Sequence, residues 1–86
     1  MDRIRQVQVF IQVMESGNFT RAAEALSIPR STVSTTIQAL EDRLEAQLLQ
    51  RTTRQVVPTH DGLQFFEAAQ TLVEAFEAAE SIFRQS

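Results

Sequence analysis

Hydrophobic residues recur every three or four positions over much of this chain, which is the spacing of one face of an α-helix. The first such stretch predicts a helix over residues 2–15. Its apolar face comprises Ile4, Val7, Ile11 and Met14, with Phe10 beside it. The segment Ser16-Gly17-Asn18 should end this helix, because Gly17 can take the left-handed conformation that commonly follows a helix.

A short helix rich in alanine is predicted next, ending near Leu26. Ala22 and Ala23 are small enough to let a second helix cross it closely. Thr20 is the expected N-cap, because its hydroxyl can accept a hydrogen bond from a first-turn N–H. Phe19 precedes that cap and is expected to pack inward.

A longer helix is predicted after Pro29, which lacks a backbone N–H and therefore belongs at a helix boundary or in a first turn. Ser27 and Ser31 are both possible caps. The apolar stripe of this helix is Val33, Ile37, Leu40 and Leu44.

The opposite face of this longer helix carries short hydrogen-bonding side chains. At about 100° per residue, these are Ser31, Thr35 and Gln38, with Ser34 on the flank. A helix that is merely solvated would usually carry Glu and Lys there. The pair of helices therefore predicts a helix-turn-helix, whose second helix has an apolar anchor and a slim polar face that fits the DNA major groove.

The helical spacing is lost after Leu44. Leu48–Arg51 and Val56–Val57 predict two short strands, joined by a polar tip and closed at an edge by Pro58. This pair would form a small two-stranded wing. Because so short a hairpin is not stable alone, it must lean on the helices.

A long last helix is predicted from Thr59, which can cap it, with Asp61 favourably placed in the first turn. A heptad seam runs along it: Phe65, Ala69, Leu72, Phe76, Ala79 and Phe83. A helix of roughly 25 residues would extend about 38 Å. It could pack on its own domain or pair with a second copy. The second interpretation is favoured, because so small a domain cannot cover the whole seam.

Composition narrows the chemistry available to the chain. Its 86 residues, 43% of them hydrophobic, allow one small domain with a modest core. There is no cysteine and only one histidine, His60, so a disulfide framework or a zinc site is not expected. No nucleophile motif or glycine-rich phosphate loop is visible, so we expect neither an enzyme nor a bound cofactor. The absence of a long apolar run or signal segment predicts no membrane span and a cytoplasmic location.

Charge is distributed unevenly. The net charge of −3 divides into +1 for residues 1–59 and −4 for residues 60–86, and all eight basic residues are Arg. Local fields, rather than the total charge, decide what a surface attracts. Glu41, Asp42 and Glu45 would repel phosphates, so the longer helix should meet DNA with its N-terminal half only.

Several motifs occur together and in order along the chain. They are Phe10 through Ala23, Val33-Ser34 with Ile37 and Leu40-Glu41, Leu48 through Arg54, and Thr59 with Gly62. In this combination the chain resembles the N-terminal DNA-binding region of LysR-type transcriptional regulators over essentially its whole length. Leu49 stands where Phe is more usual, as in one common subgroup.

The resemblance implies a mainly α fold with a small β-hairpin. It places a winged helix-turn-helix over residues 1–58 and a linker helix over residues 59–86. Two linker helices would pair antiparallel and set two recognition helices on a pseudo-palindromic DNA site. The implied protein is a bacterial transcription regulator that acts as a homodimer, with a tetramer as the alternative for the full-length protein. Its effector-binding domain, which would take a small molecule, is absent from this chain.

The resemblance also implies roles for single residues. The base-reading positions fall on Arg30, Ser31, Ser34 and Thr35. Contacts to the DNA backbone fall on Thr20, Arg21 and Arg51, and the wing contact in the minor groove falls on Arg54. Gln38, one turn further along the exposed face, is another candidate for the backbone. The heptad seam from Phe65 to Phe83 would supply the dimer interface.

Alternatives remain for these residues. Arg30 and Arg54 could each contact phosphate instead of bases, and Arg51 could brace the wing. The hydroxyl side chains could be ordinary polarity at the start of a helix. For the whole chain, one alternative is a protein-interaction module that uses the last helix. Another is a winged-helix regulator of a different family.

Four residues depart from the family pattern. Thr35 stands where Arg or Gln is frequent, which removes a long groove-reading side chain. Arg30 replaces Gln or another polar residue and could reach guanine. Glu45 replaces a frequent Gly, so the recognition helix could end differently. Pro58 replaces a frequent Leu, which leaves the length of the second wing strand open.

Overall fold

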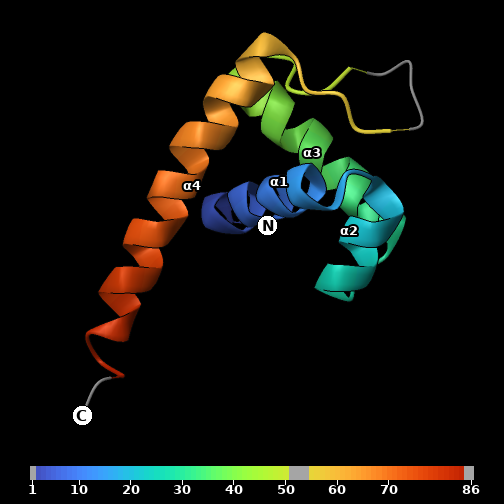
Figure 1. Cartoon of the computed structure of the whole chain (residues 1–86). Coiled ribbons are helices and arrows are strands. Elements are labelled where there is room, and N and C mark those ends of the chain that lie inside the picture. The colour runs from blue at the N-terminus through green and yellow to red at the C-terminus, as the bar shows by residue number, and fades with distance from the viewer. Residues whose placement is uncertain (1, 51–54, 85–86) are drawn as a thin grey trace.

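The computed structural model describes residues 2–50 and 55–84 of the chain. Four helices lie within these residues: α1 (Arg3–Ser16), α2 (Phe19–Leu26), α3 (Arg30–Leu44) and α4 (His60–Ser81). Figure 1 shows α1, α2 and α3 packed together, while α4 starts beside the end of α3, passes the beginning of α1 and continues beyond the other helices. The four predicted helices are therefore confirmed, with boundaries close to those expected.

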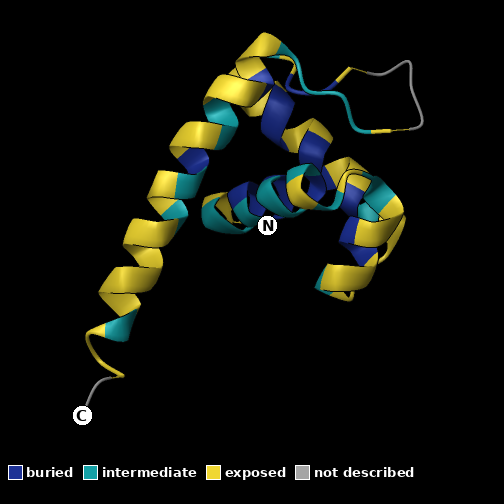
Figure 2. Cartoon of the chain, in the orientation of Figure 1, coloured by how far each residue is buried: buried dark blue, intermediate teal, exposed yellow. Residues whose placement is uncertain are grey.

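The core lies where the first three helices meet. Its buried residues are Val9, Phe10 and Val13 of α1, Ala22 and Ala23 of α2, Val33, Ile37 and Leu40 of α3, and Leu48 and Leu49 after it. Each large apolar side chain buried in this way contributes roughly 1.5–3 kcal/mol relative to exposure. Figure 2 shows buried residues on the inner faces of these helices and exposed ones along the far part of α4. The predicted stripe of α3 is confirmed except at Leu44, which is exposed because α3 is already ending there.

The turn between α1 and α2 is set by capping residues. Gly17 has φ of 81°, the left-handed conformation expected of it. Asn18 then caps α2, with its Oδ1 atom accepting a hydrogen bond from the Arg21 N–H at 2.7 Å. The prediction that Thr20 caps this helix was wrong. The helix α2 begins at Phe19, the residue before Thr20, so Thr20 lies inside its first turn. Phe19 packs against the core as expected.

The ends of α3 also differ from expectation. Neither Ser27 nor Ser31 caps it; Pro29 occupies the N-cap position, and Ser27 ends α2 in a left-handed conformation with φ of 57°. At the other end, Glu45 takes the left-handed conformation with φ of 54°. A non-glycine residue there costs on the order of 1–2 kcal/mol. Glu45 stands where Gly is frequent, yet α3 still ends in the left-handed conformation that Gly favours.

The wing is smaller than predicted within the described residues. An isolated antiparallel bridge joins Leu49 to Pro58, but no extended strand occurs in residues 2–50 or 55–84, so the β-hairpin is not confirmed. Two hydrogen bonds flank the bridge, from Gln50 N to Val57 O at 2.8 Å and from Thr59 N to Leu48 O at 2.9 Å. In this register Pro58 needs no N–H, so its presence is compatible with the pairing.

The return segment of the wing also contacts the helices. The Val56 N–H donates to the Gly17 carbonyl at 3.1 Å, in the turn between α1 and α2. That bond ties the return segment to the turn between the first two helices. The predicted tip, residues 51–54, lies outside the described residues.

The first turn of α4 is fixed against the segment after α3. Thr59 caps the helix as predicted, with Oγ1 accepting from Gly62 N at 2.9 Å and donating to Gln47 O at 2.6 Å. A Cβ at Gly62 would stand 2.0 Å from the Leu48 carbonyl oxygen. Gly62 therefore lets α4 approach the chain closely at this point.

The predicted seam of α4 divides into two parts. Phe65 lies edge-on to Phe10, with ring centroids 5.5 Å apart, and Ala69 is only 3% exposed. Beyond them, Leu72 is 47% and Phe76 is 41% exposed. The helix has 22 residues instead of roughly 25 and ends at Ser81, so Phe83 lies past its end and is 89% exposed.

Candidate nucleic-acid interface

The four predicted base-reading residues lie together on the N-terminal half of α3. Arg30, Ser31, Ser34 and Thr35 are all exposed. Val33 and Ile37 on the other side of the same turns are fully buried, so this part of the helix is anchored from behind. The arrangement presents one cation and three small hydroxyl side chains on a rigid support. These are groups that can contact phosphate oxygens and base edges.

The N-terminus of α3 differs from the other helix starts. Asp2, Asn18 and Thr59 cap α1, α2 and α4 with their side chains, whereas no side chain among the described residues caps α3. Thr32 N donates to the Pro29 carbonyl at 3.0 Å, so the amides of Arg30 and Ser31 are the ones open to another acceptor, and the helix dipole makes that end favourable for an anion. This end of α3 is therefore suited to a phosphate.

Arg30 is oriented by an aromatic ring. Its guanidinium carbon lies 6.0 Å from the centroid of Phe19, within the range of a cation–π contact. The same contact places the start of α2 beside the start of α3. Thr20 and Arg21, the predicted backbone contacts of α2, are exposed in that first turn. The structure therefore brings the base-reading and backbone-binding candidates of the two helices to one end of the molecule.

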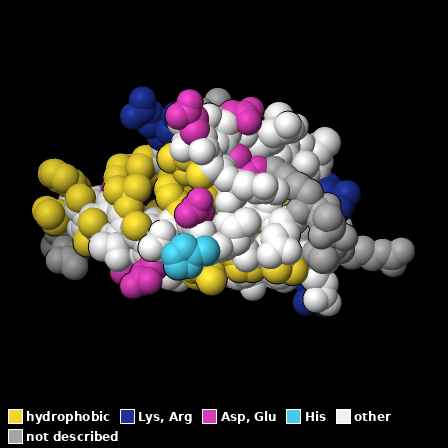
Figure 3. Space-filling view, turned by 90° about the horizontal axis from the view of Figure 1, so that it is seen from above, with side chains coloured by type: hydrophobic (Ala, Val, Ile, Leu, Met, Phe, Trp, Pro, Cys, Tyr) yellow, Lys and Arg dark blue, Asp and Glu magenta, His cyan; other side chains and the backbone are white. Residues whose placement is uncertain are grey.

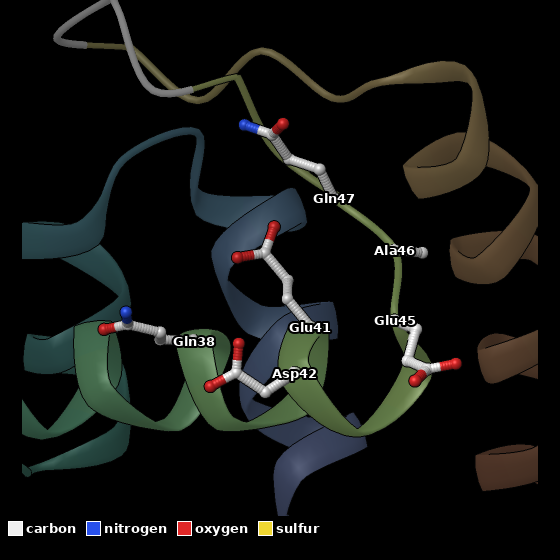
Figure 4. Close-up of a pocket in the computed structure, with 6 residues that line it drawn as sticks. All are labelled: Gln38, Glu41, Asp42, Glu45, Ala46 and Gln47. Carbon is white, nitrogen blue, oxygen red and sulfur yellow. The ribbon is translucent and has the colours of Figure 1, made fainter.

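The C-terminal half of α3 has the opposite character. An open hollow of about 460 Å³ there is lined by Gln38, Glu41, Asp42, Glu45, Ala46 and Gln47 (Figure 4). Asp42 and Glu45 are exposed, which is the placement that the predicted repulsion of phosphates requires. Gln38 is exposed at the boundary between the hydroxyl-rich and the acidic parts of the helix, where it can still reach a phosphate beside the first part.

Glu41 does not belong to the exposed acidic face, which corrects the prediction. It is only 7% exposed, and Figure 4 shows its carboxylate pointing from α3 toward the segment that follows. Its Oε2 atom accepts hydrogen bonds from Leu48 N at 2.7 Å and Leu49 N at 3.2 Å. Glu41 therefore ties α3 to the first residues of the wing, and Asp42 and Glu45 alone supply the predicted repulsion.

The remaining predicted residues are placed as follows. Arg51 and Arg54, the wing candidates, lie outside the described residues. In the predicted dimer seam, Ala69 is buried within its own chain and Phe65 is partly buried against Phe10, so the two are largely used by the core. Figure 3 shows hydrophobic side chains gathered toward the C-terminal end of α4. The surface left for a partner is therefore the later part of the seam, from Leu72 onward.

Two features were not predicted from the sequence. The bonds from Glu41 to the wing needed the three-dimensional fold, because a Glu beside Asp42 on a helix has the pattern of a solvated face. Gln6 of α1 lines a second hollow on α3, and 9% of its surface is exposed. It falls outside the apolar face predicted for α1, yet in the fold it is buried on the same side as Phe10 and Val13, next to the polar side of α3.

The described residues contain no group of three His, Asp or Glu side chains that could hold a metal ion. In the same part of the chain, no helix is long and apolar enough to cross a membrane.

Residues 4–63 match the model of the family described as bacterial regulatory helix-turn-helix protein, lysR family. Over 76 residues the chain is 46% identical to the HTH-type transcriptional regulator CrgA of Neisseria meningitidis serogroup C (strain 8013), covering 88% of this chain and 25% of that protein. Over 85 residues it is 41% identical to the HTH-type transcriptional regulator YhjC of Escherichia coli (strain K12), covering 99% of this chain and 28% of that protein. The chain thus spans about a quarter of the length of these relatives.

A solved structure of a protein–DNA complex has the same fold. The BenM DBD in its complex with benA site 1 DNA superimposes with a TM-score of 0.91 at 34% identity, covering 99% of this chain and 98% of that one.

Proposed function

Because the chain belongs to the LysR family of bacterial regulatory helix-turn-helix proteins, we propose that it binds double-stranded DNA sequence-specifically and does so as a dimer. In this proposal, α3 enters the major groove with its N-terminal half, and α2 holds the neighbouring backbone. The wing lies at the minor groove. The paired α4 helices set the distance between two recognition helices on a pseudo-palindromic site.

The observation that carries the proposal is the polarity of α3. Its uncapped N-terminal end bears Arg30 and the exposed hydroxyl side chains, and its C-terminal end bears the exposed Asp42 and Glu45. A polyanion is attracted to the first end by charge, dipole and open amides, and is repelled by the second. DNA contact by the N-terminal half is the docking that this distribution favours.

Single residues are assigned on the same basis. Arg30 can bind the O6 and N7 atoms of guanine with two hydrogen bonds, worth ~1–3 kcal/mol of discrimination. Ser31 and Ser34 are short enough to let the helix approach the groove floor. Thr20, Arg21 and Gln38 are assigned to phosphates. Arg51 and Arg54 are assigned to the wing contacts on the family resemblance alone.

Binding to a DNA fragment, titrated over a range of salt concentrations, tests the proposal. Neutralisation of several phosphates per half-site should lower log K linearly with log salt, at about 0.9 per phosphate contacted. Sites selected from a random DNA pool should share a half-site in two inverted copies. An absence of binding to bacterial promoter fragments and to the random pool at low salt would refute the proposal.

The dimer rests on the later part of the α4 seam. Leu72 and Phe76 expose large apolar side chains on a part of α4 that its own domain covers only partly, and large exposed apolar surfaces commonly mark interaction sites. Phe76→Asp should give a folded monomer that binds operator DNA much more weakly. Ala78→Asp is the matched control, because it adds the same charge about 200° around the helix. A wild-type chain that sediments as a monomer at high concentration would contradict the dimer.

A further inference from the structure

Beside the proposed base-reading residues, α3 and Gln6 of α1 line an open hollow of about 360 Å³. It is lined by Gln6, Ser31, Thr32, Thr35, Thr36 and Ala39. Ser31 and Thr35 belong to both the hollow and the proposed base-reading face. A base edge that approaches the N-terminal half of α3 would therefore meet this hollow at its rim.

The hydroxyl proton of Thr35 is already used. Its Oγ1 atom donates to the Ser31 carbonyl oxygen at 2.8 Å, one turn back on the same helix. A threonine hydroxyl has one proton and two lone pairs, so Thr35 retains only acceptor capacity toward a ligand. Thr35 is exposed, so its methyl group is available for contact with a ligand. Ala39, four residues later and also exposed, places a second methyl group on the same line.

This pair of properties, a methyl group and a hydrogen-bond acceptor, is selective among base pairs. In the major groove only thymine carries a methyl group, and only adenine and cytosine carry amino donors. A pair of adenine and thymine supplies both features that Thr35 can use. Guanine presents two acceptors, which an acceptor cannot bind, and cytosine presents an amino group without a methyl.

We infer that Thr35 specifies an adenine–thymine pair in each half-site, through van der Waals contact of its methyl group with the thymine methyl and through acceptance of a hydrogen bond from the adenine amino group. This inference rests on the proposed function, since it assigns base chemistry to one residue of the proposed DNA face. Where a long Arg or Gln side chain would donate a hydrogen bond to a base, Thr35 instead selects for the thymine methyl group.

The test uses DNA analogues in a site selected by the wild-type chain. Each thymine is replaced in turn by uracil, which removes only the methyl group. At one position per half-site, affinity should fall about fourfold, the value of one buried methyl group. At the same base pair, replacing adenine by a purine that lacks the amino group should also weaken binding. Placing 5-methylcytosine instead of cytosine at the thymine position should recover part of the affinity, because it restores the methyl group.

Two variants separate the two features. Thr35→Ser keeps the oxygen and removes the methyl group, so the difference between thymine and uracil at that position should disappear. Thr35→Val keeps the methyl group and removes the oxygen, so the thymine preference should remain and the sensitivity to the amino group should be lost. Thr71→Ser is the matched control, because Thr71 lies on α4 and its hydroxyl likewise donates to the carbonyl one turn back, at 3.4 Å.

The outcomes are distinguishable. If the wild-type chain binds its selected site but Thr35→Ser discriminates thymine from uracil as the wild type does at every position, the inference is overturned and the proposed function stands. If no site can be selected because the chain does not bind DNA, both are overturned. Loss of discrimination at a single position in Thr35→Ser, with Thr71→Ser unchanged, supports the inference.

Discussion

The two ends of α3 rest on the same buried stripe but direct their polar groups differently. At the N-terminal end, Arg30, Ser31 and Ser34 are exposed, and no side chain among the described residues caps the helix. At the C-terminal end, the Glu41 carboxylate is buried and bound to the amides of Leu48 and Leu49. One end is left open for a ligand, and the other is used to build the fold.

This difference also fixes how the helix can meet DNA. The N-terminal end combines the positive end of the dipole with Arg30, and the C-terminal end combines the negative end with the exposed Asp42 and Glu45. The N-terminal end therefore attracts a polyanion, and the C-terminal end repels it. In the proposed docking, the acidic end does not weaken the case for DNA binding; it favours the N-terminal half of the helix as the part that enters the groove.

The largest effect is expected at the C-terminal end of α3, from Glu41→Ala. This change leaves two buried amides of the wing segment without their acceptor, so the free energy of unfolding should fall by about 3 kcal/mol. Urea unfolding followed by circular dichroism measures it. Asp42→Ala, one residue along on the exposed face, is the control and should change stability by less than about 0.5 kcal/mol. Equal effects of the two would show that Glu41 does not hold the wing.

Gly62→Ala tests the other side of the same joint. A methyl group at Gly62 would lie 2.0 Å from the Leu48 carbonyl oxygen, so α4 or the wing segment must shift. The free energy of unfolding should fall by about 2 kcal/mol, despite the better helix propensity of alanine. Gln64→Ala, exposed two residues later, should leave it nearly unchanged. A Gly62→Ala protein as stable as the wild type would mean that the two segments are not held this closely.

Arg30→Ala tests the N-terminal end of α3. Stability should remain as in the wild type because Arg30 is exposed, while discrimination at one base position should fall by ~1–3 kcal/mol. Selection of sites from a random pool, compared between variant and wild type, measures this change. Arg30→Lys should show most of the same loss, since lysine lacks the planar fork of donors. A loss that is uniform over all sequences would identify Arg30 as a phosphate contact.

The smallest effect is expected when the acidic residues are neutralised. Asp42→Asn and Glu45→Gln each remove an exposed charge near the DNA backbone, so each should raise affinity by roughly twofold at low salt. The gain should shrink at high salt, because surface charges are then screened. Fluorescence anisotropy with labelled operator DNA is sensitive enough for this comparison. A decrease in affinity would place this end of α3 in contact with DNA and contradict the assignment of the two ends.

The sequence predicted features that depend on local pattern. Helical spacing located the four helices, and Gly17 and Thr59 were assigned correctly because a helix stop and a cap each need a particular residue type. Thr20 and Glu41 were misjudged, because the fold decides their roles. Thr20 and Asn18 are both good caps, and only the start of α2 selects Asn18. In the sequence Glu41 has the pattern of a surface charge, and only the fold brings the wing segment against it.

The seam of α4 shows the same limit. Its heptad spacing is continuous in sequence, yet its first part is covered by α1 and its later part is only partly covered. Spacing predicts which residues share a face of a helix but does not predict what covers that face. The same holds for Thr35: its type suggested a lost contact, and the direction of its hydroxyl bond became visible only in three dimensions.

Cross-linking at single introduced cysteines tests directly which end of α3 meets the DNA, since the chain contains no cysteine of its own. Ser34→Cys and Asp42→Cys place a thiol at each end of α3, about 12 Å apart along the helix. Each would be mixed with selected operator DNA that carries a thiol on a base in the major groove. The account predicts a disulfide to DNA from Ser34→Cys and none from Asp42→Cys. Cross-linking from Asp42→Cys at equal or higher yield would contradict it.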